Sequence, residues 1–293
     1  MKHYVEIDQL LKAGAHFGHL TRRWNPAMED FIFNERNGIH IIDLRKTQIL
    51  LTLARDAAYQ IALNGRNILF VGTKSQAKEI LKEAAKKADV NFVSERWLGG
   101  MLTNFATIRK SIKRLSTIDK MSIDGTYEKI TKKERLLFDR EKDKLRRIFG
   151  GIENMTRLPG ALFVVDTKKE HLAIKEAQNL GIPVIAIVDT NSNPMDVDFP
   201  IPANDDSRNT INLIVDVIAD SLVEGYTVAK AKRAEQQAES ERIAKETEDL
   251  GDGQPKVKRQ LRERKKSKPK AKADSPKEEV KESSEEAEQK ENS

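Results

Sequence analysis

Short, continuously apolar runs alternate along the chain with longer segments in which apolar residues recur every three or four positions. The runs are typical of strands buried on both faces, and the longer segments are typical of helices with one buried face. The expected strands are 39–44, 67–71, 90–93, 161–165 and 183–188. The expected helices are 49–61, 74–88, 168–180 and 206–223.

This alternation predicts an α/β domain. Strands and helices alternate about five times along the chain, which favours a parallel sheet with helices on both faces. Residues 1–38 precede the pattern and are expected to cap it, with a short helix from Glu6 to Ala13 and then an irregular run. We assign 1–103 and 151–225 to one α/β domain with an N-terminal extension.

Residues 104–150 interrupt the alternation. Ile108, Ile112 and Leu115 form a narrow apolar stripe, a polar turn follows around Gly125, and a second helical stretch comes after it. Two helices with narrow apolar seams predict a coiled-coil hairpin inserted in the domain. Its faces are rich in Lys and Arg, which favours RNA contact, although such residues also serve solubility alone.

Apolar periodicity stops near Tyr226. Residues 226–293 hold few large apolar side chains, too few to offset the loss of chain entropy on folding. We expect a charged, mostly disordered tail, with or without an extension of the last helix. A basic block at 256–272 is suited to contact RNA. The alternative is a solvated tail in which this block and an acidic block at 274–291 attract each other.

The charge of the chain narrows its function. It has 52 Lys plus Arg against 46 Asp plus Glu, and 33% of its residues are charged, compared with about 25% in an ordinary globular domain. Nucleic acid is the commonest partner of such a chain, and a soluble protein with a charged tail is the alternative.

Several classes of protein do not fit. The absence of cysteine excludes disulfides, thiolate metal sites and cysteine nucleophiles. The first residues lack the pattern of a signal peptide, and no apolar stretch approaches the ~20 residues that span a bilayer. We therefore expect a cytoplasmic protein without a membrane partner.

Catalytic groups are sought where strands end, because open α/β sheets bind nucleotides there. Lys74 lies in a Gly-Thr-Lys-Ser turn that could hold an anion, but the spacing of a phosphate-binding loop is missing. Asp166 and Asp189 each follow a strand in a Val-Asp-Thr tripeptide and could bind Mg²⁺. Since no partner base accompanies them, we favour a plain turn and structural caps, and assign no catalytic residue.

A histidine pair offers one further candidate. His16 and His19 are three residues apart, and such pairs can bind zinc. Without cysteine the other ligands would be carboxylates or His40. Two hydrogen-bonded or base-stacking histidines are the favoured interpretation, so neither a metal nor another cofactor is assigned.

Arginine stands beside aromatic and Asn residues in three non-helical runs, at 22–26, 33–38 and 96–105. Arginine pairs with phosphate, Trp offers a stacking face, and Gly lets backbones approach closely. Three such runs on a basic chain favour RNA binding, with Trp97 expected in the core. The expected RNA contacts are Arg22, Arg23, Trp24, Asn25, Arg36, Arg96, Asn104, Lys110 and Arg114.

Several long runs together resemble bacterial small-subunit ribosomal protein two, a universal family. They occur in family order over about 1–225 and comprise Gly14-Ala15-His16-Phe17-Gly18-His19, Arg23-Trp24-Asn25-Pro26, Asn37-Gly38-Ile39-His40-Ile41-Ile42-Asp43-Leu44, Arg96-Trp97-Leu98-Gly99-Gly100, Leu102-Thr103-Asn104-Phe105, Asp198-Phe199-Pro200-Ile201-Pro202 and Asn204-Asp205-Asp206. Pro194, Pro200 and Pro202 are expected to stiffen a loop after the fifth strand. Asn204, Asp205 and Asp206 are expected to cap the final helix, and we assign this acidic loop to the fold or to protein contact rather than to RNA.

The resemblance implies a flavodoxin-like α/β domain with the coiled-coil hairpin inserted after the third strand. It also implies a non-catalytic protein on the ribosome that contacts small-subunit rRNA near the junction of head and body, beside other small-subunit proteins. Members of the family help to recruit small-subunit ribosomal protein one. Two alternatives are a nucleotide-dependent enzyme built on Lys74, Asp166 and Asp189, and an RNA-binding regulator that acts off the ribosome.

Overall fold

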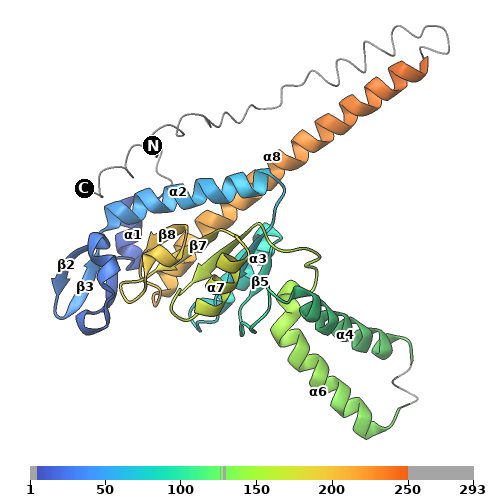
Figure 1. Ribbon diagram of the computed structural model, residues 1–293, viewed down its shortest axis with the longest axis horizontal. Helices are drawn as coiled ribbons and strands as arrows, with labels where there is room; N and C mark the ends of the chain where they lie inside the picture. The colour runs from blue at the N-terminus through green and yellow to red at the C-terminus, as the bar shows by residue number, and fades with distance from the viewer. Residues whose placement is uncertain (1–4, 126, 128–129, 250–293) are drawn as a thin grey trace, which may run out of the picture. The chain divides into compact units, whose positions relative to one another are not determined.

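Five parallel strands form the central sheet of the computed structural model, which describes residues 5–125, 127 and 130–249 (Figure 1). Their spatial order is β5-β4-β6-β7-β8. The strands are β4 (Ile68–Val71), β5 (Asn91–Val93), β6 (Ala161–Val165), β7 (Val184–Val188) and β8 (Phe199–Pro202). Numbered along the chain, this is the order 2-1-3-4-5 of flavodoxin-like folds, which confirms the expected fold class.

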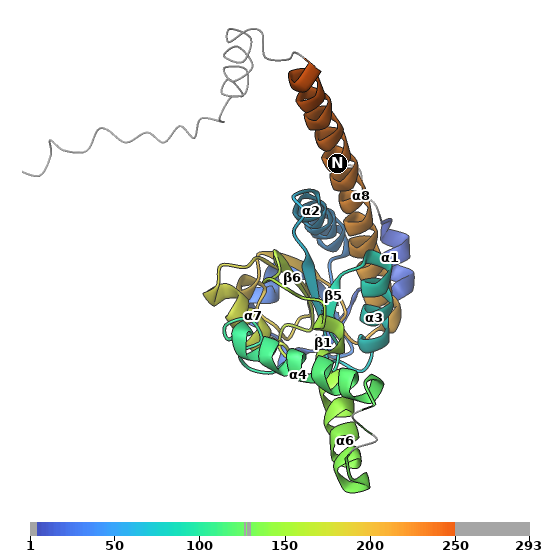
Figure 2. The ribbon, with the colours of Figure 1, turned by 90° about the vertical axis from the view of Figure 1, so that its right-hand side faces the viewer.

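The sheet separates two apolar cores, because successive side chains of a strand point to opposite faces. In β6, Phe163 and Val165 face one core, whereas Leu162 and Val164 face the other. Figure 2 shows helices on both sides of the sheet. The first core lies under α1 (Ile7–Ala13), α2 (Leu44–Leu63), α3 (Lys78–Ala88) and α8 (Arg208–Asp249), and the second under α7 (His171–Asn179) and the start of α4.

The expected parallel strand at 39–44 is wrong. Residues Ile39–Ile42 form β3, the middle strand of a separate antiparallel sheet with β1 (Phe17–Leu20) and β2 (Ile32–Arg36). Asn37 and Gly38 join β2 to β3 with φ values of 56° and 73°, the backbone that a tight Asn-Gly hairpin turn requires. The N-terminal extension is therefore an ordered layer rather than an irregular run.

The proline-rich run at 199–202 is a strand rather than the expected loop. β8 pairs in parallel with β7, opposite Ala186 and Val188, and is the last strand of the sheet. Proline has no backbone N–H, so it is tolerated on an edge strand, where one side of the ladder needs no donor. The prolines of this run are therefore consistent with a strand at the edge of the sheet.

Two helices occupy the interval predicted for the hairpin: α4 (Phe105–Ile123) and α6 (Lys132–Phe149). Ile108, Ile112, Leu115 and Ile118 are buried along α4, as the stripe predicted. Salt bridges join the helices, and in Figure 1 they diverge toward the connecting turn. Coiled-coil packing along the pair stays a prediction.

The last helix continues past Tyr226 to Asp249, so ordered helix extends beyond the boundary expected at 225. A compact unit reaches Gln236. The basic and acidic blocks predicted for the tail fall within 250–293 and lie outside the described residues. Between residues 5 and 249, none of the helices has the length and apolar character needed to cross a membrane.

Gly225 allows α8 to pack closely on α2. A Cβ there would lie 2.7 Å from the Cβ of Ala62 and 2.9 Å from the carbonyl oxygen of Tyr59. We predict that Gly225→Ala lowers the free energy of unfolding by about 1–3 kcal/mol through overpacking, although Ala ordinarily favours a helix over Gly. Chemical denaturation measures this.

The matched control is Gly99→Ala, because no atom lies within 4 Å of a Cβ built there. It should change the free energy of unfolding little. A Gly225→Ala variant at least as stable as the parent chain would contradict the close approach of α8 to α2.

Candidate RNA interface and the charged cluster at the sheet edge

Five of the nine expected RNA contacts lie on the N-terminal layer, and together they form what we call the N-terminal basic surface: Arg22, Arg23, Trp24, Asn25 and Arg36. All three arginines are exposed. Arg22 and Arg23 belong to the 3-10 turn η1 (Thr21–Arg23), and Arg36 ends β2. Three guanidinium groups on one small antiparallel layer can pair with phosphates without leaving buried charge behind.

Trp24 and Asn25 have mixed roles. The indole of Trp24 is 37% exposed and lies against the His40 ring, with centroids 5.2 Å apart, so part of it stays open for stacking. The side-chain oxygen of Asn25 accepts from the Ala27 N–H at 3.0 Å and caps the turn η2 (Pro26–Phe31). For Asn25 this local role weakens the argument for an RNA contact.

The N-terminal layer is anchored to the residue two positions beyond β7. The backbone N–H of Asn25 donates to the carbonyl of Thr190 at 2.8 Å, and that of His19 donates to the Thr190 hydroxyl at 2.8 Å. Gly18 also approaches Thr190 so closely that a Cβ would lie 2.7 Å from its methyl carbon. The sheet therefore sets the position of the basic surface.

The other four expected contacts form a second group, the loop–hairpin surface: Arg96 and Asn104 in the loop between β5 and α4, and Lys110 and Arg114 on α4. All four are exposed. Arg114 makes two hydrogen bonds to Glu141, each 3.1 Å, and its guanidinium lies 5.5 Å from the Phe138 ring centroid. The internal ion pair makes Arg114 the weakest candidate of the four.

The structure does not bring all nine residues together. The N-terminal basic surface is anchored beyond β7, whereas the loop–hairpin surface follows β5, and these strands lie toward opposite ends of the sheet order. Figure 1 shows β2 and β3 on one side of the domain and α4 on the other. Any RNA that contacts both groups must be a large folded surface rather than one short strand.

Glu176 on α7 is a residue that sequence reasoning missed. It is buried, and its carboxylate accepts hydrogen bonds from the loop between β5 and α4. The donors are Trp97 Nε1 at 3.1 Å, Gly100 N at 2.7 Å, Leu102 N at 2.9 Å, and Thr103 N and Oγ1, both at 3.1 Å. The only signal in the sequence was a Glu among the apolar positions of a helix.

These hydrogen bonds set the ionisation of Glu176. Burial by itself opposes the charged form, but the bonds from Thr103, Leu102, Trp97 and Gly100 outweigh it and hold the pKa below its ordinary value. Trp97 is buried, which confirms its expected place in the core and removes it as a base-stacking residue.

A charged cluster fills the carboxyl-terminal edge of the sheet. Its members are His19, Lys74, Asp166, Asp189, Asp205 and Asp206. Lys74 Nζ lies 2.7 Å from Asp205, 2.6 Å from Asp206 and 3.5 Å from Asp166. The carboxyl ends of parallel strands meet at one edge, which explains why residues so distant in sequence converge.

The cluster shifts the pKa values of its members. Burial, together with Asp189 and Asp166, raises the pKa of Asp205 to about 7. Burial opposes the charge of Lys74, yet its hydrogen bonds to Asp205 and Asp206 raise its pKa overall. A hydrogen bond to Asp189 raises the pKa of His19. Each shift reflects one crowded set of carboxylates around a single ammonium group.

Lys74, Asp166 and Asp189 do lie close together, as the enzyme alternative required. However, Lys74 is already paired with carboxylates, and the acidic groups around it would repel a phosphate. Of the two histidines considered as zinc ligands, His16 packs against Phe17 with ring centroids 4.0 Å apart. His19, Asp205 and Asp206 offer one ligand atom each, within 4.8 Å of one another, and could hold a cation.

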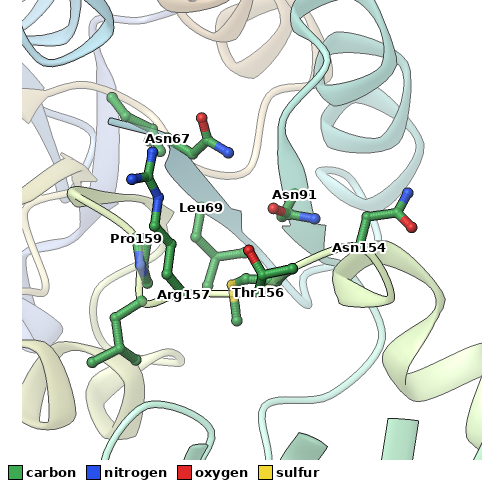
Figure 3. A pocket seen from close by; sticks show the side chains of 10 residues that line it. Asn67, Leu69, Asn91, Asn154, Thr156, Arg157 and Pro159 are labelled. Carbon is green, nitrogen blue, oxygen red and sulfur yellow. The ribbon is translucent and has the colours of Figure 1, made fainter. Parts of the chain in front are cut away.

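A small pocket at the opposite edge, where β4 and β5 begin, is lined by both polar and apolar residues, and two of the polar side chains are paired within the protein (Figure 3). Arg157 Nη2 donates to the Gly65 carbonyl at 2.8 Å, and Asn91 Nδ2 donates to the Gly151 carbonyl at 3.3 Å. These contacts tie the segment after α6 to β5 and to the turn that follows α2.

The fold and these surfaces define an α/β scaffold whose usual nucleotide-binding edge is occupied by its own ion pairs and whose exposed arginines lie on outer loops. Residues 10–225 match the profile of the family described as ribosomal protein S2. The chain belongs to this family, whose members are structural components of the small ribosomal subunit and not enzymes.

Two relatives support the assignment. The chain is 57% identical over 229 residues to the small ribosomal subunit protein uS2 of Chlorobaculum parvum, covering 78% of this chain and 91% of the relative. It is 55% identical over 245 residues to the protein of the same name from Chloroherpeton thalassium, covering 84% and 97%. The similarity therefore includes nearly the whole length of the relatives.

Removing the cation of the charged cluster should destabilise the fold. Lys74→Met leaves the fully buried Asp205 beside other carboxylates without its counter-ion. We predict a loss of about 2–4 kcal/mol in the free energy of unfolding. The double variant Lys74→Met with Asp205→Asn should recover part of it, since both charges are then gone. Additive losses in urea denaturation would show that the two groups are not coupled.

The lowered pKa of Glu176 predicts how stability depends on pH. Because the folded-state pKa lies below the ordinary value of 4.5, the ionised carboxylate stabilises the fold above that value, and the contribution is lost as the pH falls through the folded-state pKa. The difference in unfolding free energy between the parent chain and Glu176→Gln should narrow from pH 7 to about pH 3.5. A difference that stays constant would rule out the hydrogen-bonded carboxylate.

Proposed function

We propose that this chain binds small-subunit rRNA near the junction of head and body and thereby supports subunit assembly and translation in the cytoplasm. The observation that carries the proposal is the exposure of Arg22, Arg23 and Arg36 on a layer anchored to the sheet through Thr190. Membership of a small-subunit family points to rRNA as the partner. The exposed arginines provide the guanidinium groups that can pair with its phosphates.

The binding mode follows from the side chains. Arginine forks pair with phosphate oxygens, and these contacts fix the position of a protein on folded RNA without reading its sequence. Trp24 adds a partly open stacking face, which suits an unpaired base. Arg96, Asn104, Lys110 and Arg114 extend the contact to the far side of the domain, so the chain would join two parts of the rRNA.

The acidic sheet edge suits a protein partner. Asp206 belongs to the charged cluster and its side chain is 54% exposed, and Met195, in the connection that leaves β7 for β8, is 82% exposed. Carboxylates repel phosphate, so RNA would avoid this edge, whereas protein can use both features. We assign to it contact with other small-subunit proteins and help in recruiting small-subunit ribosomal protein one. Small subunits that lack this chain should then carry less ribosomal protein one in quantitative mass spectrometry.

Charge reversal tests the N-terminal basic surface. Arg23→Glu with Arg36→Glu should weaken incorporation into small subunits about tenfold or more, through lost phosphate contacts and added repulsion. Sucrose-gradient sedimentation at low and high salt measures incorporation. The parent chain should travel with small subunits near one copy each and move toward the top at high salt.

The matched control reverses Lys230 and Lys232, which are exposed on α8 and give the same change in net charge. It should incorporate normally, and both variants should keep the parent melting temperature. Normal incorporation of folded Arg23→Glu/Arg36→Glu would remove the N-terminal contact. A parent chain that stays at the top of the gradient at both salt concentrations would favour an RNA-binding role off the ribosome.

A further inference from the structure

The loop from Arg96 to Asn104 carries two of the proposed RNA contacts on an unusual internal support. Arg96 and Asn104 are exposed at its ends. Between them, Met101 and Leu102 are buried, and Gly100 has a φ of 87°. The loop then passes directly into α4, so its conformation also sets where the hairpin begins.

One carboxylate from a distant helix holds the inside of this loop. Oε1 of Glu176 accepts from the Trp97 indole and the Gly100 N–H, and Oε2 accepts from the Leu102 N–H and from both donors of Thr103. Three backbone N–H groups of the loop, those of Gly100, Leu102 and Thr103, thus point at one buried charge. Hydrogen bonds to a charged acceptor are about twice as strong as neutral ones.

Apart from the core packing of Trp97, Met101 and Leu102, the described residues give this loop few other hydrogen bonds. Gly99 and Gly100 widen the range of backbone conformations, and the bonds within the loop run from Met101 N to the Leu98 carbonyl and from Asn104 N to the Gly100 carbonyl. Without the carboxylate, the N–H groups of Leu102 and Thr103 would lose the acceptor found for them, and a buried donor without an acceptor is costly.

We infer that Glu176 is a positioning residue for RNA binding: by gathering these donors it holds Arg96 and Asn104 in the orientation that presents them to rRNA. This inference rests on the proposed function and adds to it a buried acidic residue that never contacts RNA.

The direction in which Glu176→Gln changes the affinity for RNA distinguishes a positioning role from simple electrostatics. Glu176→Gln keeps the shape of the side chain and removes one negative charge, which by itself would favour binding to a polyanion. It also replaces one oxygen with an NH2 group that faces donors. In either orientation of the amide, at least two loop donors lose their acceptor. Positioning therefore predicts weaker binding, and electrostatics alone predicts stronger binding.

The experiment measures binding of the full chain to small subunits depleted of this protein, over a range of salt concentrations. The variants are Arg96→Gln, Glu176→Gln and their combination, with Glu153→Gln as the control that removes the same charge from an exposed position. We expect each of the first two variants to weaken binding about tenfold and to lower the salt slope by about one unit. The combination should be no weaker than the stronger single variant, and Glu153→Gln should not weaken binding.

Several outcomes would overturn the inference. Glu176→Gln could lower the melting temperature yet keep the affinity and the salt slope, or the two variants could act additively, or Arg96→Gln could leave binding unchanged. If Glu176→Gln does not fold, Thr103→Val removes one of the five donors and should weaken binding in the same direction by less. If the parent chain does not bind, the proposed function itself fails, which is distinct from binding that is insensitive to Glu176.

Discussion

The ammonium group of Lys74 neutralises carboxylates that the parallel sheet forces together. Strands β6, β7 and β8 all end at the same edge, and Asp166, Asp189 and Asp205 follow them at once or within three residues. Left alone, such a group of like charges would oppose folding. Lys74 comes from the turn after β4 and pairs with Asp205 and Asp206, so its ammonium group offsets the carboxylates that meet at this edge.

This internal pairing bears on where the proposed RNA contacts lie. In open α/β proteins the carboxyl edge is the usual place for a nucleotide, but here the edge is acidic and its lysine is occupied. The exposed arginines instead lie on the antiparallel layer and on the loop after β5, outside the cluster. A fold that elsewhere serves catalysis thus forms a structural component of the small ribosomal subunit here, in agreement with the family to which the chain belongs.

Both basic surfaces depend on contacts that lie beneath them. Thr190 receives backbone donors from Asn25 and His19, and Glu176 receives the donors of the loop that ends in Asn104. In each case a residue at the sheet or on its covering helix fixes a loop that carries exposed charge. Rigid placement matters for RNA binding, because phosphate contacts give affinity only when several are made at once.

The alternation of strands and helices, the two helices of the insertion and the exposure of the arginines could all be predicted from the sequence, because each depends on local apolar periodicity and composition. Three features became visible only in the folded chain: Ile39–Ile42 joins an antiparallel layer, the prolines of β8 lie on an edge strand, and Glu176 and Asp205 are buried with partners far along the chain. A short apolar run does not specify its neighbour, and a charged residue does not reveal its counter-ion, since both are chosen by segments that meet only after folding.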